Sequence, residues 1–392
     1  MSETIEKFNK HVMQTYGRLP IVLEKGHNDD AVDENGKEYI DFGSGIGTNS
    51  LGYCNDKWSD AVCAQARAIQ HTSNYFYTKV QADFAAKLCE LTGYTDVFFG
   101  NSGAEANECA IKLARKYSFD KYGKDAERYK IITLVNSFHG RTLCTLSATG
   151  QDVFHNYFFP FVEGFVNVKA NDIDDLRAKV DDKVCAIMFE CVQGEGGVNP
   201  LDKAFIEEIF RIAAEKDILT ICDEVQTGMG RTGTVLASEQ FGVKPNVTTL
   251  AKGIAGGVPM GACLADEKCA DVLTKGTHGS TFGGNPIACA GGNVVCDRLA
   301  SAGFLDEIKK KGEYFREKLN AMDGVEGVDG MGLMIGIRFK DKEKKAADVC
   351  KACLDKGLLV LTAKDKLRLL PPLTISYAEI DKGLAVIEES LK

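Results

Sequence analysis

Long hydrophobic runs are missing from this chain of 392 residues. No apolar stretch approaches the roughly 20 residues that cross a lipid bilayer. The first residues, MSETIEKFNK, also lack the apolar core of a signal peptide. Internal repeats, low-complexity tracts and proline-rich linkers are absent as well. The sequence therefore predicts a cytoplasmic protein that does not associate with membranes and whose lobes are closely joined.

An excess of positive charge is missing too. The chain has 47 Lys and Arg against 56 Asp and Glu, which gives a formal net charge of −9, and the charges are scattered along it. Proteins that bind nucleic acid or anionic membranes need a basic stripe or patch, which this pattern does not supply. We therefore expect no nucleic-acid partner and predict that the protein acts on small molecules.

Cysteine is abundant, with fourteen residues, but the paired spacings of a disulfide or zinc framework are missing. Cysteine within an apolar run behaves as a small hydrophobic residue. Six cysteines lie in such runs: Cys89, Cys109, Cys185, Cys222, Cys263 and Cys289. The close pair Cys350 and Cys353 has no second pair beside it and lies in a helical pattern. The cysteines are therefore predicted to be reduced, and no metal is expected.

Short β-branched runs that alternate with amphipathic helical stretches dominate the middle of the chain. The runs include VFFG, YKIITLV, VCAIMFECV, ILTICDEV, VTTLAKG and VPMGACLA, and the helical patterns include AEANECAIKLARKY and LDKAFIEEIFRIAAEKD. Parallel strands joined by crossover helices produce this alternation. We predict an α/β fold over residues 53–286, with a mostly parallel central sheet and flanking helices.

The two ends of the chain have a different pattern. DDAVDENGKEYIDF alternates around Asn35-Gly36, which is a strong hairpin signal. After residue 286 come the helical stretch GFLDEIKKKGEYFREKLNAM, strands around GLMIGIRF, and a last helix that begins near Tyr377. We predict that residues 1–52 and 287–392 fold together as a smaller α+β domain, beside a large domain of residues 53–286.

Two consecutive apolar strands end in residues of opposite charge, Asp223 and Lys252. In open parallel sheets the ligand lies at the carboxyl ends of the strands. Pyridoxal phosphate (PLP) needs such a pair, because its aldehyde forms a Schiff base with an amine and its pyridine nitrogen is kept protonated by a carboxylate. The pair predicts a PLP site in which Lys252 and Asp223 are the catalytic residues.

Other strand ends carry residues that suit the same ligand. Ser102 stands at the expected N-cap of a helix, followed by the small residues Gly103 and Ala104, and a helix N-terminus of this kind binds phosphate. An ordinary capped helix explains that segment equally well when it is taken alone. In SFHGRT, Phe138 is suited to cover a planar ring and Arg141 to hold a carboxylate in a bidentate fork.

A competing motif follows Asp223. The segment from Gly228 to Gly233 fits the dinucleotide pattern GxGxxG, but Glu239 is at the wrong distance for a ribose-binding acid. Asp223 and Glu224 also occupy the strand end where a pyrophosphate needs bare backbone. A nicotinamide-dependent oxidoreductase is thus the alternative from another class.

Six segments, GNSGAEAN, SFHGRT, QGEGGV, DEVQTGMGRTG, TLAKGIAGGVPMGA and HGSTFGGNP, together resemble the class III PLP-dependent aminotransferases in order and spacing. The resemblance covers nearly the whole chain and implies PLP-dependent transferase fold type I. It also implies that Lys252 carries PLP and moves the substrate proton, and that Asp223 pairs with the pyridine nitrogen. The remaining cofactor contacts that it implies are Gln226 at the ring hydroxyl, Val225 and Phe138 on the ring faces, Ser102, Gly103 and Ala104 at the phosphate, and Thr281 at the phosphate of the partner subunit in a homodimer.

The same resemblance implies how substrates bind. Arg141 and Arg368 would hold carboxylates, Glu195 would mask Arg368 until 2-oxoglutarate enters, and Ser280 would belong to the substrate site. The expected reaction is the transamination of N2-acetyl-L-ornithine with 2-oxoglutarate in arginine biosynthesis. The alternatives are 4-aminobutyrate, succinyldiaminopimelate and ornithine aminotransferases, and a PLP-binding protein without turnover. Ornithine aminotransferases have a tyrosine at the place of Gly45, and Glu190-Cys191 replaces the Glu-Pro that is usual in the family.

Overall fold

A computed structural model describes residues 2–392, and its centre is a seven-stranded sheet. The strand order is β4-β12-β11-β10-β7-β5-β6. The strands are β4 (Asp96–Gly100), β5 (Lys130–Leu134), β6 (Phe165–Val168), β7 (Val184–Phe189), β10 (Leu219–Asp223), β11 (Val247–Leu250) and β12 (Gly261–Ala265). Neighbouring strands run parallel except β12, which is antiparallel to both β11 and β4. The mostly parallel sheet predicted from the alternating pattern is therefore confirmed.

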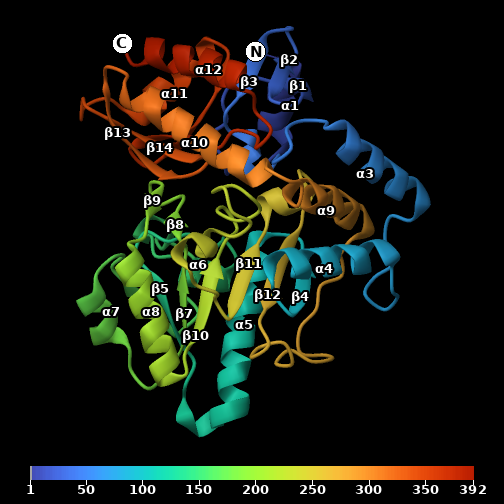
Figure 1. The fold of residues 1–392 in the computed structure, drawn as a ribbon, viewed down its shortest axis with the longest axis vertical. Helices are drawn as coiled ribbons and strands as arrows, with labels where there is room; N and C mark the ends of the chain where they lie inside the picture. The colour runs from blue at the N-terminus through green and yellow to red at the C-terminus, as the bar shows by residue number, and fades with distance from the viewer. Residues whose placement is uncertain (1) are drawn as a thin grey trace.

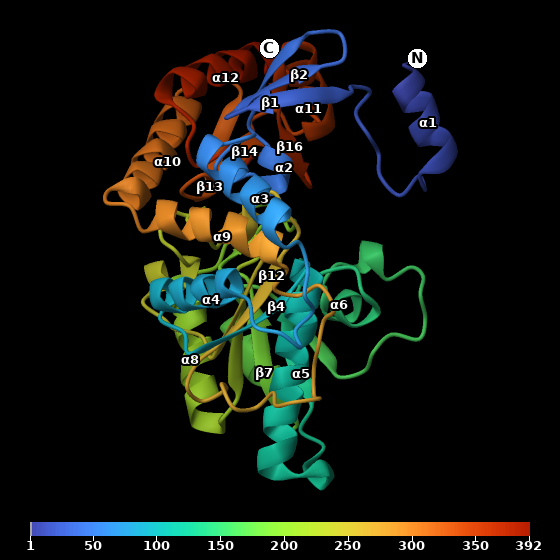
Figure 2. The same cartoon turned by 90° about the vertical axis from the view of Figure 1, so that its right-hand side faces the viewer.

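Helices cover both faces of this sheet (Figure 1 and Figure 2). Successive strand side chains point to opposite faces, so each strand feeds two cores. On one face, α8 (Lys203–Lys216) packs Ile206 and Ile209 in a cluster with Ile187 of β7, together with α7 (Ile173–Lys179). On the other face, α5 (Gly103–Tyr122) packs Ala110 in a cluster with Met188. The remaining helices of this part are α3 (Asp56–Ala68), α4 (Lys79–Thr92), α6 (Leu143–Ala148) and α9 (Pro286–Leu299).

The two ends of the chain meet at the top of Figure 1, where the blue and red segments lie together. One sheet contains β1 (Leu23–His27), β2 (Asp30–Asp33), β3 (Glu38–Asp41) and β15 (Leu358–Leu359), and another contains β13 (Val325–Met331), β14 (Met334–Phe339), β17 (Lys366–Leu369) and β16 (Leu361–Ala363). The hairpin predicted around Asn35-Gly36 is the antiparallel pair β2 and β3. Strand β15 adds to β3 in parallel, with Leu358 opposite Ile40. The helices are α10 (Phe304–Asn320), α11 (Ala346–Asp355) and α12 (Tyr377–Ser390).

The largest hydrophobic cluster runs without a break from the central sheet into this upper part. It joins Phe84 of α4 and Leu250 of β11 to Phe42, Ile337 and Leu367. Helix α9, which the sequence assigned to the small domain, packs against α3 and α4. The division at residues 52 and 286 stays a prediction, and the two parts share a continuous core.

The smaller elements complete the chain. They are α1 (Glu3–His11), which Figure 2 shows apart from the body, the turn α2 (Ser44–Gly47), the short hairpin β8 (Val192–Gln193) and β9 (Asn199–Pro200), and the 3-10 turns η1 (Lys124–Ala126), η2 (Asp152–Phe154), η3 (Ala237–Phe241) and η4 (Lys252–Ala255). All fourteen cysteines are free thiols, as predicted. Within residues 2–392, no helix has the length and apolar character needed to cross a membrane.

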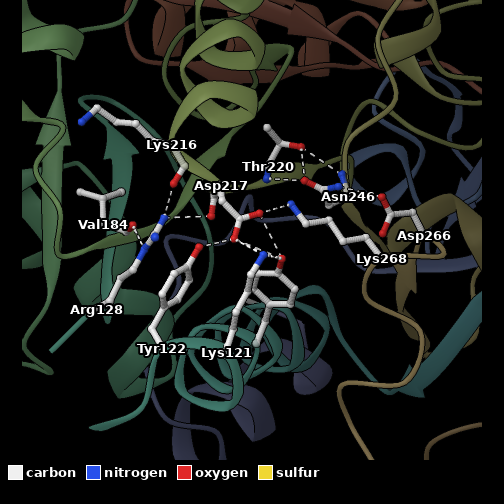
Figure 3. Close-up of polar contacts among 11 residues, drawn as sticks. Lys121, Tyr122, Arg128, Val184, Lys216, Asp217, Thr220, Asn246, Asp266 and Lys268 are labelled. Carbon is white, nitrogen blue, oxygen red and sulfur yellow. Dashed lines mark hydrogen bonds and ion pairs between the residues drawn. The ribbon is translucent and has the colours of Figure 1, made fainter. Parts of the chain in front are cut away.

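Asp217 ties the end of α8 to the end of α5 (Figure 3). It stands in left-handed backbone (φ 51°) directly after α8. Its carboxylate accepts hydrogen bonds from Tyr117 at 3.1 Å and from Tyr122, and it pairs with Lys121 at 2.7 Å and Lys268 at 2.9 Å. Burial acts to raise the pKa of Asp217, but these partners hold it below its usual range. These contacts lie just before β10, at the end of the sheet opposite the site described next.

Candidate active site

The strand ends named in the sequence surround one cavity of about 440 Å³. It is lined by residues that follow β4, β5, β10 and β11, because the carboxyl ends of parallel strands meet at one edge of the sheet. Ten of the predicted site residues lie in its wall: Ser102, Gly103, Ala104, Phe138, Arg141, Glu195, Asp223, Val225, Gln226 and Lys252. The structure thus brings together in space a set that is spread over 150 residues of sequence.

The N-terminus of α5 forms one wall of this cavity. Ser102 caps the helix, with its hydroxyl accepting from the backbone N–H of Glu105 at 3.2 Å. The first N–H groups of a helix have no acceptor within it, so they are free for an anion. A Cβ on Gly103 would lie 2.8 Å from the side chain of Val225. Glycine is therefore needed for this close approach of the helix to Val225, two residues after β10.

Asp223 is held by three donors at the end of β10. Its Oδ2 accepts from Asn107 Nδ2 at 2.7 Å and lies 2.8 Å from His139 Nδ1, and its Oδ1 accepts from the Val225 N–H at 3.0 Å. A carboxylate can only accept, so His139 carries its proton on Nδ1. Thr249 fixes the amide of Asn107 by donating to Oδ1 at 2.7 Å. The acid is buried and preorganised, with its charge oriented before any ligand arrives.

Sequence reasoning missed Asn107 and His139 as members of the site. A signal for Asn107 was present, because it is a polar residue beside the buried stripe of α5 that contains Ala106 and Ala110. His139 lies between Phe138 and Arg141, the two residues of SFHGRT that were singled out. Its Nε2 is buried and has no hydrogen-bond partner among the described residues.

Lys252 follows β11, at the first position of η4. Its backbone is left-handed (φ 50°), which is uncommon for a residue with a side chain and typical of functional sites. Burial lowers the pKa of Lys252 to about 8, and nearby Glu195 opposes this effect. Roughly a tenth of the amine is then unprotonated at neutral pH, compared with well under a hundredth for an ordinary lysine. The amine is suited to attack an aldehyde.

Glu190 supports the loop that carries Phe138. Its Oε1 accepts from the Phe138 N–H at 2.9 Å, and its Oε2 accepts from the Gly194 N–H at 3.3 Å. Burial raises the pKa of Glu190 to about 7, and the negative charge of Asp223 adds to this effect. The carboxyl group therefore links the β5 loop to the glycine-rich turn after β8.

Glu195, which lines the cavity, forms an ion pair with Arg368, which lies behind it. Arg368 Nη1 lies 2.6 Å from Glu195 Oε1, and the Gln226 amide contacts both residues at 3.3 Å. Arg368 is 3% exposed. Burial acts to raise the pKa of Glu195, but the Arg368 charge holds it below its usual range. Glu195 thus neutralises the buried cation of Arg368, which would otherwise attract a substrate carboxylate.

Arg141 has no such partner. Its guanidinium carbon lies 4.1 Å from the ring centroid of Phe154 and 5.7 Å from that of Phe138. Across residues 2–392, no carboxylate pairs with it, and the side chain is exposed at the cavity wall. This cation is free to receive an external carboxylate.

Besides Arg368, two predicted residues, Ser280 and Thr281, do not line the cavity. They line a second cavity of about 640 Å³, together with Asn74 and Tyr75. The two cavities are linked by Asn101, which lines the first and donates from Nδ2 to Ser280 Oγ at 3.1 Å. Their roles, like those of the other site residues, stay predictions.

The GxGxxG segment has a packing explanation. A Cβ on Gly228, Gly230 or Gly233 would lie 2.5–2.6 Å from Leu250, Leu299 or Lys309. The glycines permit these contacts, and the N–H groups of all three donate to backbone carbonyls of the chain, so they are not free for a dinucleotide. The alternative of a nicotinamide-dependent enzyme therefore gains no support.

The donor set of the cavity fits PLP. A lysine of lowered pKa, a fixed carboxylate, an aromatic ring and a helix N-terminus match the aldehyde, the pyridine nitrogen, the ring and the phosphate of that cofactor.

Comparison with known proteins agrees with this site. Residues 12–391 match the family model of class-III aminotransferases. The chain is 49% identical to an acetylornithine aminotransferase of Haemophilus ducreyi, over 97% of this chain and 96% of the relative, and 46% identical to one of Aquifex aeolicus, over 97% and 100%. The chain therefore belongs to the class III aminotransferases and is a PLP-dependent transaminase.

Solved structures of similar shape come from the same enzyme class. An ornithine aminotransferase of Toxoplasma gondii has a TM-score of 0.94 and 32% identity, covering 99% of this chain and 94% of that one. An N-acetylornithine aminotransferase of Stenotrophomonas maltophilia has a TM-score of 0.85 and 33% identity, with 98% of each chain covered. Fold type I is thus confirmed, but shape alone does not separate the two donors.

Proposed function

We propose that this enzyme transfers the terminal amino group of N2-acetyl-L-ornithine to 2-oxoglutarate, forming N-acetyl-L-glutamate 5-semialdehyde and L-glutamate in arginine biosynthesis. One observation carries the choice of donor. Relatives named acetylornithine aminotransferase are 42–49% identical over nearly the whole chain.

The turn at Gly45 supports the same donor. Gly45 has left-handed backbone (φ 62°), and its carbonyl accepts from Thr48 Oγ1 at 2.8 Å. Thr48 lines the cavity. A glycine leaves room for an acyl group and offers no hydroxyl to a free ammonium, so an uncharged N-acetyl donor is favoured over ornithine.

The residues of the site have separate roles in the reaction. PLP, when bound, supplies the electron sink that stabilises the carbanion of the substrate. Lys252 Nζ would take the proton from the reacting carbon of the substrate and deliver it to the cofactor carbon. Asp223, oriented by Asn107 and His139, keeps the pyridine nitrogen protonated, which preserves the electron sink. Phe138 and Val225 enclose the ring.

Two arginines serve two substrates in turn. Arg141 binds the α-carboxylate of acetylornithine, which lies far from the reacting amine. During that half-reaction Glu195 keeps Arg368 neutralised, so the apolar chain of the donor meets no bare cation. In the second half-reaction a carboxylate of 2-oxoglutarate replaces Glu195 on Arg368.

A cytoplasmic homodimer with shared sites completes the proposal. Thr281 lies outside the cavity of its own chain, so we assign it to the phosphate of the partner subunit. The large aromatic residues Tyr75, Tyr77 and Phe282 are 93%, 106% and 58% exposed, and Tyr75 lines the same cavity as Thr281. Clustered exposed aromatics are typical of interfaces.

Subunit mixing tests the shared site. Lys252→Ala and Thr281→Val homodimers should each have low activity, and mixing them should restore part of it, since one site of each heterodimer has both native residues. A fully active monomer in sedimentation would overturn this arrangement.

Amino-donor profiling tests the reaction itself. With 2-oxoglutarate as acceptor and glutamate as the measured product, kcat/KM for N2-acetyl-L-ornithine should exceed that for ornithine and for 4-aminobutyrate by about tenfold or more, at about 1.4 kcal/mol per factor of ten. Ornithine is disfavoured because its free α-ammonium finds no hydroxyl at Gly45, and 4-aminobutyrate because its carboxylate offers Arg141 only a shorter reach. A preference for ornithine, 4-aminobutyrate or succinyldiaminopimelate would replace the donor and leave the aminotransferase class intact.

A further inference from the structure

Phe154 lies against Arg141 but belongs to no motif of the site. It ends the turn η2 in the long loop after α6, and its ring centroid is 4.1 Å from the guanidinium carbon of Arg141. The rings of Phe154 and Phe138 are also in contact, edge to face, with centroids 5.9 Å apart. The three side chains therefore form one cluster, in which Phe138 and Arg141 line the cavity and Phe154 lies behind them.

The turn that carries Phe154 is anchored to the body of the protein. Gln151 is buried and donates from Nε2 to the Ser137 carbonyl at 3.1 Å, and the Phe154 N–H donates to the Gln151 carbonyl at 3.0 Å. On the other side, His155 Nε2 lies 2.9 Å from a backbone carbonyl of α6. Residues 157–159 of the same loop are in contrast 61–73% exposed. Phe154 is thus a fixed surface, not part of the exposed loop tip.

The contact with Phe154 leaves the guanidinium able to bind. A ring contacts the face of a guanidinium, whereas the N–H donors lie in its plane. Arg141 can therefore stay on Phe154 while two of its N–H groups fork onto a carboxylate. A long side chain that is held before the ligand arrives loses less conformational freedom on binding.

We infer that Phe154 is a positioning residue that preorganises Arg141 for the α-carboxylate of the amino donor, and so contributes to the preference for α-carboxylated donors. The inference rests on the proposed function, because that function assigns Arg141 to the donor carboxylate.

The test compares two donors that differ only in the carboxylate, N2-acetyl-L-ornithine and N-acetyl-1,4-diaminobutane. In Phe154→Leu holoenzyme, the ratio of their kcat/KM values should fall about three- to tenfold, mainly through KM for acetylornithine, as expected for the loss of a cation–π contact. Phe154→Tyr keeps the aromatic face and should restore the ratio. Tyr157→Leu is the matched control, because it also replaces an aromatic residue of this loop by leucine, at a position that is 70% exposed. It should leave the ratio unchanged.

A double-mutant cycle shows whether Phe154 acts through Arg141. In an Arg141→Ala background, Phe154→Leu should not change the ratio further, since the contact is already gone. An unchanged ratio in Phe154→Leu, or equal losses of kcat/KM on both donors with no rescue by tyrosine, overturns this inference and leaves the proposed function intact. A wild-type enzyme that does not distinguish the two donors overturns the role of Arg141 in the proposed function, and the inference with it.

Discussion

Replacing Glu195 with glutamine should separate the two half-reactions. Glu195 Oε1 and Arg368 Nη1 are 2.6 Å apart, and the side chains are 30% and 4% exposed. A hydrogen bond between charged groups contributes about 1.5–3 kcal/mol net, and the partial exposure of Glu195 favours the lower end. To reach Arg368, 2-oxoglutarate must displace this contact. Removing the negative charge should therefore lower KM for 2-oxoglutarate about tenfold, at about 1.4 kcal/mol per factor of ten.

The donor half-reaction should respond in the opposite direction. Without Glu195 the cation of Arg368 faces the uncharged chain of acetylornithine, so kcat/KM for this donor should fall. Single-turnover absorbance with each substrate alone measures the halves separately. Glu215→Gln is the matched control, because Glu215 pairs with Arg211 at the same 2.6 Å on the outer surface of α8. A 2-oxoglutarate half-reaction that is unchanged or weaker in Glu195→Gln would refute the reasoning.

Three further changes test the cofactor contacts and the fold. The wild-type apoenzyme should capture PLP faster as pH rises through about 8, since only the unprotonated Lys252 amine reacts. In Lys252→Ala, borohydride should fix no cofactor and turnover should fall by several orders of magnitude. Capture of PLP by the wild-type enzyme that is independent of pH would contradict this assignment. Asp223→Ala should raise the barrier of the chemical step by about 3 kcal/mol or more, and near-normal turnover would show that the acid does not pair with the ring nitrogen. Asp217→Asn should lower Tm at pH 7 by an amount equivalent to about 1 kcal/mol, because the amide keeps the left-handed turn but loses the charge. Since the pKa of Asp217 is held low in the fold, the difference in Tm between wild type and Asp217→Asn should be fully present above about pH 4 and shrink in stronger acid. A Tm difference that grows in acid would be inconsistent with this role of Asp217.

Local patterns were sufficient to predict much of the fold. The β-branched runs became strands of the central sheet, and Ser102 caps α5 where its spacing predicted a helix start. Strand β6 escaped prediction because Phe165–Val168 is a short edge strand that is only partly buried, so its pattern is weak. Hydrophobic periodicity records burial along one element and does not record which elements meet.

The candidate site shows the same limit. Motif spacing located Asp223 and Lys252, because chemistry restricts which residue types can hold the cofactor. It did not reveal Asn107, which reaches Asp223 across 116 residues of sequence. The contact of Phe154 with Arg141 was also invisible, since it depends on how a loop folds back on the body.

The pairing of β15 with β3 has a consequence for how the protein is made. Leu358 completes a sheet whose other strands lie before residue 42, so the nascent chain exposes the edge of β3 until nearly all of it has left the ribosome. An exposed strand edge is a template for pairing with other chains. Translation that stops before residue 358 should therefore leave an aggregation-prone fragment, even though the strands and helices of the central sheet are already complete.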